Sequence, residues 1–285
     1  MSRTVAIDLP ATTPAPWPAP RESTWELRPG DVIAPGRHVV RRLAGGGAHE
    51  AFLVRTGGVP RLAVAKLPRP HVAEDPHCLL RLRSEGRALE QLAHPGLPRH
   101  FDTVLFGPHP HMLLEYMPGT TLAGTFAARR PLCPPVVAQL GLALARTLDH
   151  IARAGWVHLD IKPSNIVTGD APGLLDFELA RTVADAAAMT RPSGTWAYMP
   201  PEQRAAGEAG EPVGPPADVF ALAMSLGEAL SGHAFARRPA ALLGPVGTVL
   251  HEALAPRPGD RPTAAELAAG LAEVAEPSTT LAAAA

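Results

Sequence analysis

Lysine and asparagine are almost absent from this chain. Its 285 residues include 24 arginines but only two lysines, Lys66 and Lys162, and a single asparagine, Asn165. Arginine cannot act as a compact ammonium group, and no basic or apolar side chain supplies a neutral amide oxygen. In a composition that exchanges lysine for arginine almost everywhere, these three positions are candidates for chemistry that other residues cannot perform.

Cysteine is also scarce, and Cys78 and Cys133 lie far apart in the sequence. Neither belongs to a Cys-x-x-Cys pair or to a Cys/His metal-binding spacing, which argues against a disulfide framework and a zinc site. The formal net charge is −1, so the chain lacks the positive charge that nucleic acid or an acidic membrane attracts. We expect two free thiols and neither nucleic acid nor a membrane as a partner.

Long apolar runs are missing as well. No stretch reaches the roughly 18 apolar residues of a membrane-spanning helix, and Asp8 and Pro10 interrupt the segment where a signal peptide needs an apolar centre. We therefore expect a cytoplasmic protein. Proline is abundant, with six of its 33 copies in the first 30 residues. Residues 1–30 and 277–285 are therefore predicted to be flexible arms.

Between these arms the hydrophobic pattern changes from β-like to helical. The predicted strands are His38–Leu43, Ala51–Arg55, Leu62–Leu67, Thr103–Phe106 and His111–Glu115. The predicted helices are Cys78–Ala93, Val136–Ala154, Val219–Leu230, Ala241–Leu254 and Thr263–Glu276, the last beginning with a Thr263/Glu266 capping box. This order predicts an α+β fold with a small β-rich N-terminal lobe (31–117) and a larger helical C-terminal lobe (118–276).

Lys162 and Asn165 share one short segment with Asp160, in the pattern Asp-x-Lys-x-x-Asn. A carboxylate in such a loop can accept a hydroxyl proton, an ammonium can neutralise a phosphoryl oxygen, and an amide oxygen can bind a hard divalent cation. Further along, an apolar run ends at Asp176. This pattern is typical of a strand that delivers a metal-binding carboxylate to a cleft.

The other lysine, Lys66, lies in an alternating strand pattern, and Glu85 on the predicted helix could pair with it. Before them, Gly45, Gly46 and Gly47 lie between two β-like runs. A glycine-rich turn lets backbone amide groups approach phosphates closely, although a purely structural turn would have the same composition.

In this order the motifs resemble the eukaryotic-type (Hanks-type) serine/threonine protein kinases, in particular their bacterial members. The resemblance extends from about Leu27 to Glu276 and includes Gly194–Glu202, which is similar to the end of a kinase activation loop. It implies the two-lobe protein-kinase fold. It also implies transfer of the γ-phosphoryl group of ATP, with Mg²⁺ or Mn²⁺, to Ser or Thr hydroxyls of a protein substrate.

The resemblance further implies a role for each motif residue. Those that would bind ATP are the turn of Gly45, Gly46 and Gly47, the phosphate-binding Lys66 with its partner Glu85, the gatekeeper Leu114, and the hinge from Glu115 to Met117. Those that would act on the phosphoryl group are the base Asp160, Lys162, and the metal ligands Asn165 and Asp176. Glu202 would pair with Arg261, and Asp218 would brace the loop of Asp160.

Some positions depart from the kinase pattern. Ala44 and His49 replace the first and third glycines of the phosphate loop, so we expect a stiffer loop and weaker ATP binding. Glu178 replaces the glycine after Asp-Phe, which should restrict flipping of that motif without removing its metal ligand. Leu159 replaces the arginine that usually receives a phosphorylated activation loop, so phosphorylation there is not expected to be obligatory. Pro200 replaces an alanine and is expected to be harmless.

Two other functions stay open. The substituted glycine positions fit a nucleotide-binding pseudokinase that serves as a scaffold. A small-molecule phosphotransferase of the aminoglycoside or choline kinase type would share Asp160 and Asn165, but such enzymes generally lack the intervening lysine and the Gly194–Glu202 segment.

Two clusters are expected to be solvated rather than functional. The histidines His94, His100, His109 and His111 are interleaved with Pro and Gly, so nothing fixes them as a metal site. The arginines Arg81, Arg83 and Arg87 are predicted to form the wet face of the helix that carries Glu85.

Overall fold

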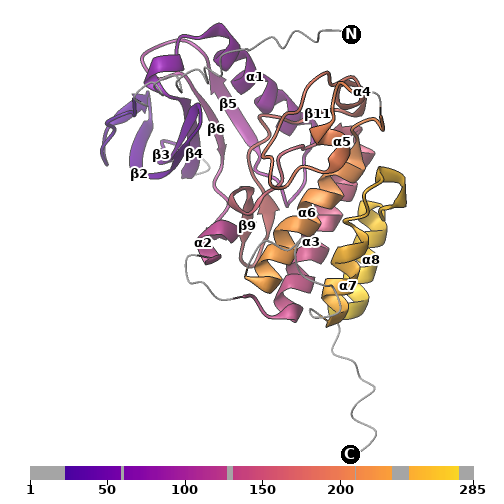
Figure 1. Ribbon diagram of the computed structural model, residues 1–285. Helices are drawn as coiled ribbons and strands as arrows, with labels where there is room; N and C mark the ends of the chain where they lie inside the picture. Colours follow the sequence, from indigo (N-terminus) through magenta and orange to yellow (C-terminus); the bar gives the residue numbers. More distant parts are fainter. Residues whose placement is uncertain (1–22, 59–60, 127–130, 209, 233–243, 276–285) are drawn as a thin grey trace, which may run out of the picture.

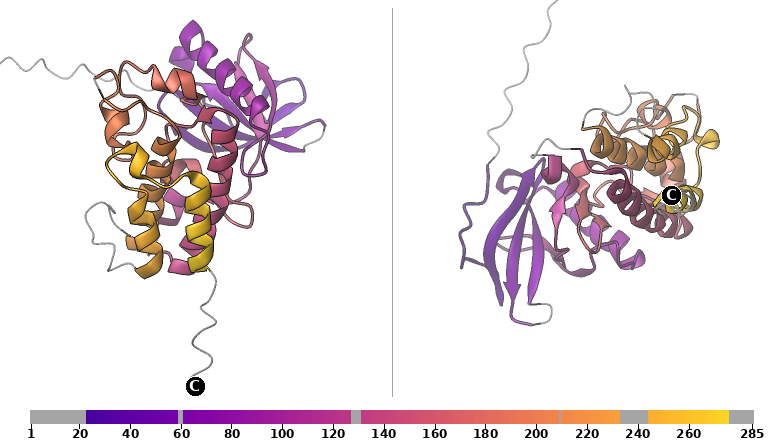
Figure 2. Two further views of the ribbon diagram at one scale, coloured as in Figure 1. Left: turned by 90° about the vertical axis from the view of Figure 1, so that its right-hand side faces the viewer. Right: turned by 90° about the horizontal axis from the view of Figure 1, so that it is seen from below.

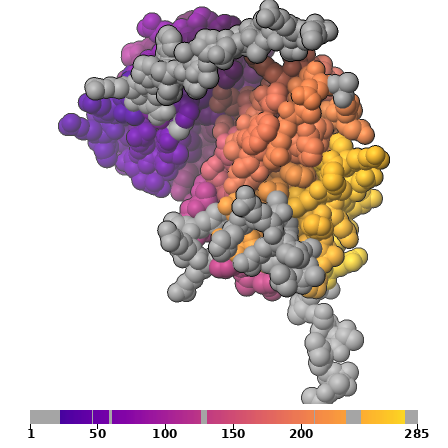
Figure 3. Space-filling view, viewed as in Figure 1, coloured from indigo at the N-terminus to yellow at the C-terminus, as the bar shows by residue number. Residues whose placement is uncertain are grey.

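The computed structural model describes residues 23–58, 61–126, 131–208, 210–232 and 244–275. They form an N-terminal lobe around a six-stranded sheet and a C-terminal lobe made mainly of helices (Figure 1). In the space-filling view the indigo and purple N-terminal lobe lies against the pink and orange parts of the C-terminal lobe (Figure 3). The expected α+β architecture, with the small β-rich lobe first, is confirmed.

The N-terminal sheet is antiparallel, with the strand order β1-β2-β3-β4-β6-β5. Its register places Lys66 on β4 between Ala51 on β3 and Met112 on β6. Lys66 is therefore held on both sides by paired strands. The strands are β1 (Val32–Ala34), β2 (Arg37–Gly46), β3 (His49–Thr56), β4 (Leu62–Pro68), β5 (His100–Val104) and β6 (His111–Glu115).

Helix α1 (Pro76–Gln91) packs against β4, β5 and β6 (Figure 2). Its start is fixed by Asp75, whose side chain accepts a hydrogen bond from the His77 N–H (2.9 Å). Pro76 suits the first helical position because proline has no N–H, and an N–H at that position would have no partner within the helix. The buried face carries Leu82, Leu89 and the acidic Glu85. A buried carboxylate needs a polar or charged partner, so the burial of Glu85 indicates a polar site between this helix and the sheet.

Residues 23–30 lie against the N-terminal sheet. The Trp25 indole Nε1 donates to the Pro68 carbonyl (2.7 Å), and the Trp25 backbone N–H donates to Glu50 Oε2 (2.8 Å). Leu27 packs with Trp25 on the apolar cluster that contains Phe52. This stretch therefore contributes to the N-terminal lobe. The rest of the expected N-terminal arm, 1–22, and the tail at 277–285 lie outside the described residues.

The C-terminal lobe is built around α3 (Pro134–Arg153), which packs against α6 (Pro215–Ser231), α7 (Gly244–Glu252) and α8 (Ala264–Ala275). Helices α3 and α6 begin earlier than their apolar periodicity predicts because each starts with a pair of prolines, which suit the first helical turn. The predicted capping box of α8 is confirmed. Glu266 N–H donates to Thr263 Oγ1 (3.2 Å), and Thr263 N–H donates to Glu266 Oε2 (2.7 Å).

The C-terminal lobe also contains short elements. They are β7 (Thr120–Thr121), α2 (Leu122–Phe126), β8 (Trp156–Val157), β9 (Ile166–Thr168), β10 (Gly173–Leu174), β11 (Arg181–Thr182), α4 (Val183–Ala187) and α5 (Pro201–Arg204). Strand β9 begins directly after Asn165, and its partner β10 ends just before Asp176. The pairing therefore brings both predicted metal ligands to one end of a small hairpin. Over the described ranges, no helix is long and apolar enough to cross a membrane.

Two expectations about the edge of the N-terminal sheet are wrong. The last strand before β6 lies at His100–Val104 rather than Thr103–Phe106, and Phe106 is 85% exposed beside a turn. His111 is fully buried rather than solvated. It donates from Nδ1 to the His109 carbonyl (2.7 Å), while Arg37 reaches Nε2. Burial and the Arg37 guanidinium lower the pKa of His111 and keep the ring neutral.

Candidate active site

Lys66 lies between two carboxylates. Its Nζ donates to Glu85 Oε2 and to Asp176 Oδ1, both at 2.6 Å, so β4, α1 and the loop after β10 meet at one ammonium group. Burial alone would lower the pKa of Lys66, but the two carboxylates outweigh burial and hold the pKa above its ordinary value. Burial would likewise raise the pKa of Asp176, yet Lys66 lowers it to about 2. The expected pairing of Lys66 with Glu85 is present, and Asp176 joins it.

The backbone turns sharply at Asp176. This residue has a left-handed φ of 68°, which is uncommon outside glycine. The next residue, Phe177, is buried, and its ring meets the His158 ring edge-on with centroids 4.5 Å apart. The Phe177 N–H donates to Glu85 Oε1 (3.1 Å). Glu85 therefore holds Lys66 with one oxygen and the backbone beside Asp176 with the other.

Asp218 on α6 anchors the loop that carries Asp160. Its buried carboxylate accepts hydrogen bonds from the backbone N–H groups of His158 (2.7 Å) and Leu159 (2.8 Å). These two hydrogen bonds support a left-handed φ of 68° at Leu159. The bracing contact expected for Asp218 is therefore present.

Four polar side chains converge on the end of this loop. Asp160 Oδ1 accepts from Thr195 Oγ1 (2.7 Å), and Asp160 Oδ2 accepts from Lys162 Nζ (2.7 Å). Lys162 also donates to Thr195 Oγ1 (2.9 Å), and Asn165 Nδ2 donates to the Asp160 carbonyl (2.9 Å). Asp160 thus already accepts a hydroxyl hydrogen, which is the interaction that a base requires before proton transfer.

Apart from Lys66, the predicted nucleotide-binding residues belong to β2, the turn before β3, β6 and the segment that follows β6. Strands β2 and β3 remain paired up to Gly46 and His49, so the glycine turn is a tight hairpin in which Gly47 has a φ of 52°. Leu114 is buried on β6, and Glu115 ends that strand opposite Ala63. Between the hinge and the C-terminal lobe, the methyl group of Met117 fills the space that a Cβ on Gly173 would occupy.

The oxygen atoms at this centre suit a magnesium ion. Asn165 uses its Nδ2 to bind the Asp160 carbonyl, and its amide oxygen, which accepts only a long hydrogen bond from Ser164 Oγ (3.5 Å), is the atom that would ligate a metal. Asp176 adds an ionised carboxylate. Within the described residues, no group of three or more His, Cys, Asp or Glu side chains could hold a metal by itself. Two protein oxygens completed by phosphate oxygens are a usual arrangement for Mg²⁺. Asn165 and Asp176 therefore fit a metal that binds together with a nucleotide.

Two of the departures from the kinase pattern contact each other. His49 Nδ1 lies 3.3 Å from Glu178 Oε2, and Arg81 Nη1 on α1 lies 3.3 Å from Glu178 Oε1. The hydrogen bond with His49 lowers the pKa of the Glu178 carboxyl in spite of its burial. Sequence reasoning treated these positions separately and missed the contact, since nothing in the sequence pairs residues 129 positions apart.

A third departure, Leu159, is buried in an apolar cluster with Ala186 and Met189 of the segment that follows Asp176. Gln203 on α5 joins the same pieces through its Nε2, which donates to the Leu159 carbonyl (2.9 Å) and the Ser193 carbonyl (2.6 Å). Apolar packing and amide hydrogen bonds thus hold the segment where kinases often use an arginine and a phosphate.

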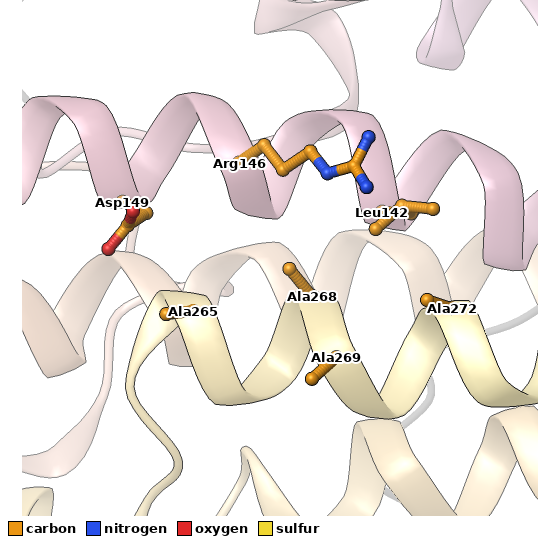
Figure 4. A pocket seen from close by; sticks show the side chains of 7 residues that line it. All are labelled: Leu142, Arg146, Asp149, Ala265, Ala268, Ala269 and Ala272. Carbon is orange, nitrogen blue, oxygen red and sulfur yellow. The ribbon is translucent and has the colours of Figure 1, made fainter.

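A groove between α3 and α8 lies in the C-terminal lobe, on helices that carry none of the candidate site residues (Figure 4). Its lining residues are Leu142, Arg146, Asp149, Ala265, Ala268, Ala269 and Ala272. The small alanine side chains of α8 leave this space under Arg146. The groove is therefore a consequence of helix packing and is not part of the candidate active site.

The fold agrees with comparisons to known proteins. Residues 43–241 match the protein kinase domain family. The chain is 36% identical over 214 residues to the probable serine/threonine-protein kinase PkwA of Thermomonospora curvata (72% of this chain, 28% of the relative). It is 31% identical over 196 residues to the serine/threonine-protein kinase PknB of Mycobacterium leprae (66% of this chain, 31% of the relative). The chain therefore corresponds to about a third of the length of these relatives.

Among solved structures, the kinase domain of Mycobacterium tuberculosis PknI superposes with a TM-score of 0.66 at 28% identity. That superposition covers 87% of this chain and 99% of the PknI domain. The two-lobe arrangement, the matched domain and these relatives agree with one another. The chain belongs to the protein kinase family, within the bacterial Hanks-type serine/threonine protein kinases.

Proposed function

We propose that this chain transfers the γ-phosphoryl group of ATP, bound with Mg²⁺ or Mn²⁺, to Ser or Thr hydroxyls of a protein substrate. The observation that carries the proposal is the junction at Lys66, whose Nζ lies 2.6 Å from both Glu85 and Asp176. This arrangement aligns an ammonium for the phosphates with a carboxylate for the metal. Phosphoryl transfer depends mainly on such positioning and charge neutralisation.

Each group has a distinct part in this proposal. Asp160 orients the acceptor hydroxyl and takes its proton, while Lys162 beside it neutralises charge on the transferred phosphoryl group. When bound, the metal ion shields the phosphate oxygens, and Asn165 and Asp176 would hold it. The hinge from Glu115 to Met117, behind the gatekeeper Leu114, would receive adenine. The glycine turn 45–47 would cover the phosphates.

The contact between Lys162 and Thr195 favours a protein substrate over a small molecule. Thr195 belongs to the segment that leads into α5, and its hydroxyl is shared by Asp160 and Lys162. A small-molecule phosphotransferase would need neither this lysine nor the segment.

The pseudokinase alternative rests on Ala44, His49 and Glu178. Against it, Lys66, Glu85, Asp160, Lys162, Asn165 and Asp176 are all present and joined by short hydrogen bonds. Degenerate members usually lose one of these groups. We therefore favour an active enzyme.

The assay that tests the proposal incubates the protein with labelled ATP, Mg²⁺ or Mn²⁺, and a basic protein substrate. We expect phosphoserine or phosphothreonine with the wild type and none with Asp160→Asn, because the amide cannot take the proton. ATP binding, measured by calorimetry, should persist in the variant. ATP binding without any Asp160-dependent product would support the scaffold instead, and label on a small-molecule acceptor alone would support the third alternative.

Activity is expected without phosphorylation of the activation segment. Leu159 stands where an arginine would bind the phosphate, and the segment is instead held by apolar packing and Gln203. Phosphatase-treated protein and the variants Thr190→Ala and Ser193→Ala should therefore show unchanged initial rates. A long lag after phosphatase treatment, abolished by prior incubation with ATP, would contradict this prediction.

A further inference from the structure

The contact between His49 and Glu178 joins two parts of the site that are otherwise separate in the chain. His49 is the first residue of β3 after the glycine turn, and Glu178 follows Asp176 by two positions. On β3, His49 and Ala51 share the face of the sheet that carries Lys66, because Ala51 pairs with Lys66 and side chains alternate along a strand. The contact therefore lies beside the Lys66 junction.

The surroundings of the pair fix its hydrogen bond. An ionised carboxylate only accepts, so the proton between the two residues sits on His49 Nδ1. On the other side of the ring, Nε2 lies 3.6 Å from Cys78 Sγ on α1. His49 is 7% exposed, and the Glu178 side chain is 20% exposed. The imidazole is therefore held between α1 and the Asp176 segment with little access to water.

The second partner of Glu178 contributes less. Arg81 extends from α1, and its side chain is 61% exposed. An exposed ion pair contributes little because water and salt screen it. The buried His49 is thus the principal partner, and Arg81 ties the same carboxylate weakly to α1.

We propose that His49 and Glu178 form a positioning pair that fastens the glycine turn and helix α1 to the metal-binding segment, holding the arrangement in which Lys66 contacts both Glu85 and Asp176. Each residue replaces a glycine of the family pattern, and the two replacements compensate each other. Either change alone would be unfavourable. A lone Glu178 would keep only the exposed Arg81 as a partner for a carboxylate beside Asp176. A lone His49 would be buried without its acceptor.

The proposal rests on the proposed kinase function, and a double-mutant cycle tests it. The variants are His49→Ala, Glu178→Ala and the double variant, with Asp149→Ala as control because Asp149 pairs with the exposed Arg153 on α3, outside the site. We expect each single variant to raise the KM for ATP about tenfold and the double variant to raise it by about the same factor, because contacting residues are non-additive. The KM for the protein substrate should not change.

A purely structural role predicts a different pattern. Loss of folded protein lowers kcat without changing the KM for ATP, and independent effects would multiply to about a hundredfold in the double variant. Either result would overturn the proposal. Should Glu178→Ala fail to fold, Glu178→Gln and Glu178→Leu replace it. The amide oxygen still accepts from His49 Nδ1, so Gln should keep the KM for ATP near that of the wild type, and Leu should raise it.

Hydrogen exchange makes the test independent of catalysis. In Glu178→Ala we expect faster amide exchange over residues 45–52 and over α1, and in Asp149→Ala no change in either region. If the wild type shows no Asp160-dependent activity but these exchange effects appear, the proposed function fails and the positioning pair stands. Unchanged exchange in Glu178→Ala, with or without activity, would refute the pair.

Discussion

Replacing Lys66 by arginine is expected to lower kcat/KM by about two to three orders of magnitude, which is the loss typical of removing one preorganised group that stabilises developing charge. Arginine conserves the positive charge of Lys66 but not the shape of the charged group. Lys66 Nζ fits between two carboxylate oxygens at 2.6 Å each, inside a sheet paired on both sides. A planar guanidinium is larger and donates in a fixed fork, so it cannot take both positions and still face a phosphate.

The matched control for Lys66→Arg is the reverse exchange on the neighbouring strand. Arg55 on β3 is exposed, and Arg55→Lys should leave kcat/KM unchanged. Thermal unfolding of both variants checks that Lys66→Arg remains folded. The measurement is steady-state phosphorylation of the basic substrate with ATP as the varied reactant. Turnover near that of the wild type in folded Lys66→Arg would mean that the nucleotide phosphates bind elsewhere.

The scarcity of lysine and asparagine proved to be a strong guide to the site. In a chain with two lysines and one asparagine, all three side chains lie in the two clusters around Asp176 and Asp160. The order of the motifs also predicted that Lys66 pairs with Glu85 and that Asp218 braces the loop of Asp160. Local patterns were sufficient here because each motif is short and carries its own chemistry.

What the sequence did not predict depends on contacts between distant segments. The pairs β8–β11 and β9–β10 involve two or three residues each, too few to show a periodicity. His111 lies among Pro and Gly, so its burial follows from Arg37 on a distant strand rather than from its neighbours in sequence. The contact of His49 with Glu178 likewise arises only when β3 and the Asp176 segment meet. Secondary-structure propensity and motif spacing carry no information about such long-range contacts.

The second large effect concerns stability. Arg261→Ala is expected to lower the free energy of unfolding by about 3–5 kcal/mol, the usual cost of leaving one partner of a buried ion pair alone. The side chains of Arg261 and Glu202 are 0% and 2% exposed, and their two hydrogen bonds measure 2.7 and 2.8 Å. Arg261 also donates to three backbone carbonyls, those of Ala255, Pro256 and Pro216. Alanine would leave the carboxylate and these carbonyls without their donor.

Urea unfolding of three variants separates this cost from a general effect of losing an arginine. Arg153→Ala removes the exposed partner of Asp149 and should change stability by less than about 1 kcal/mol. Arg261→Lys restores the charge but not the fork, so we expect an intermediate loss. The double variant Arg261→Met, Glu202→Leu removes both charges and should be more stable than Arg261→Ala, because the main penalty is the unpaired carboxylate. Both variants lose the carbonyl contacts of Arg261, so equal stability of the two would mean that the penalty comes from those contacts and not from the unpaired carboxylate. The pair would then act as a backbone clamp between α5, α6 and the turn before α8 rather than as a pair of opposite charges.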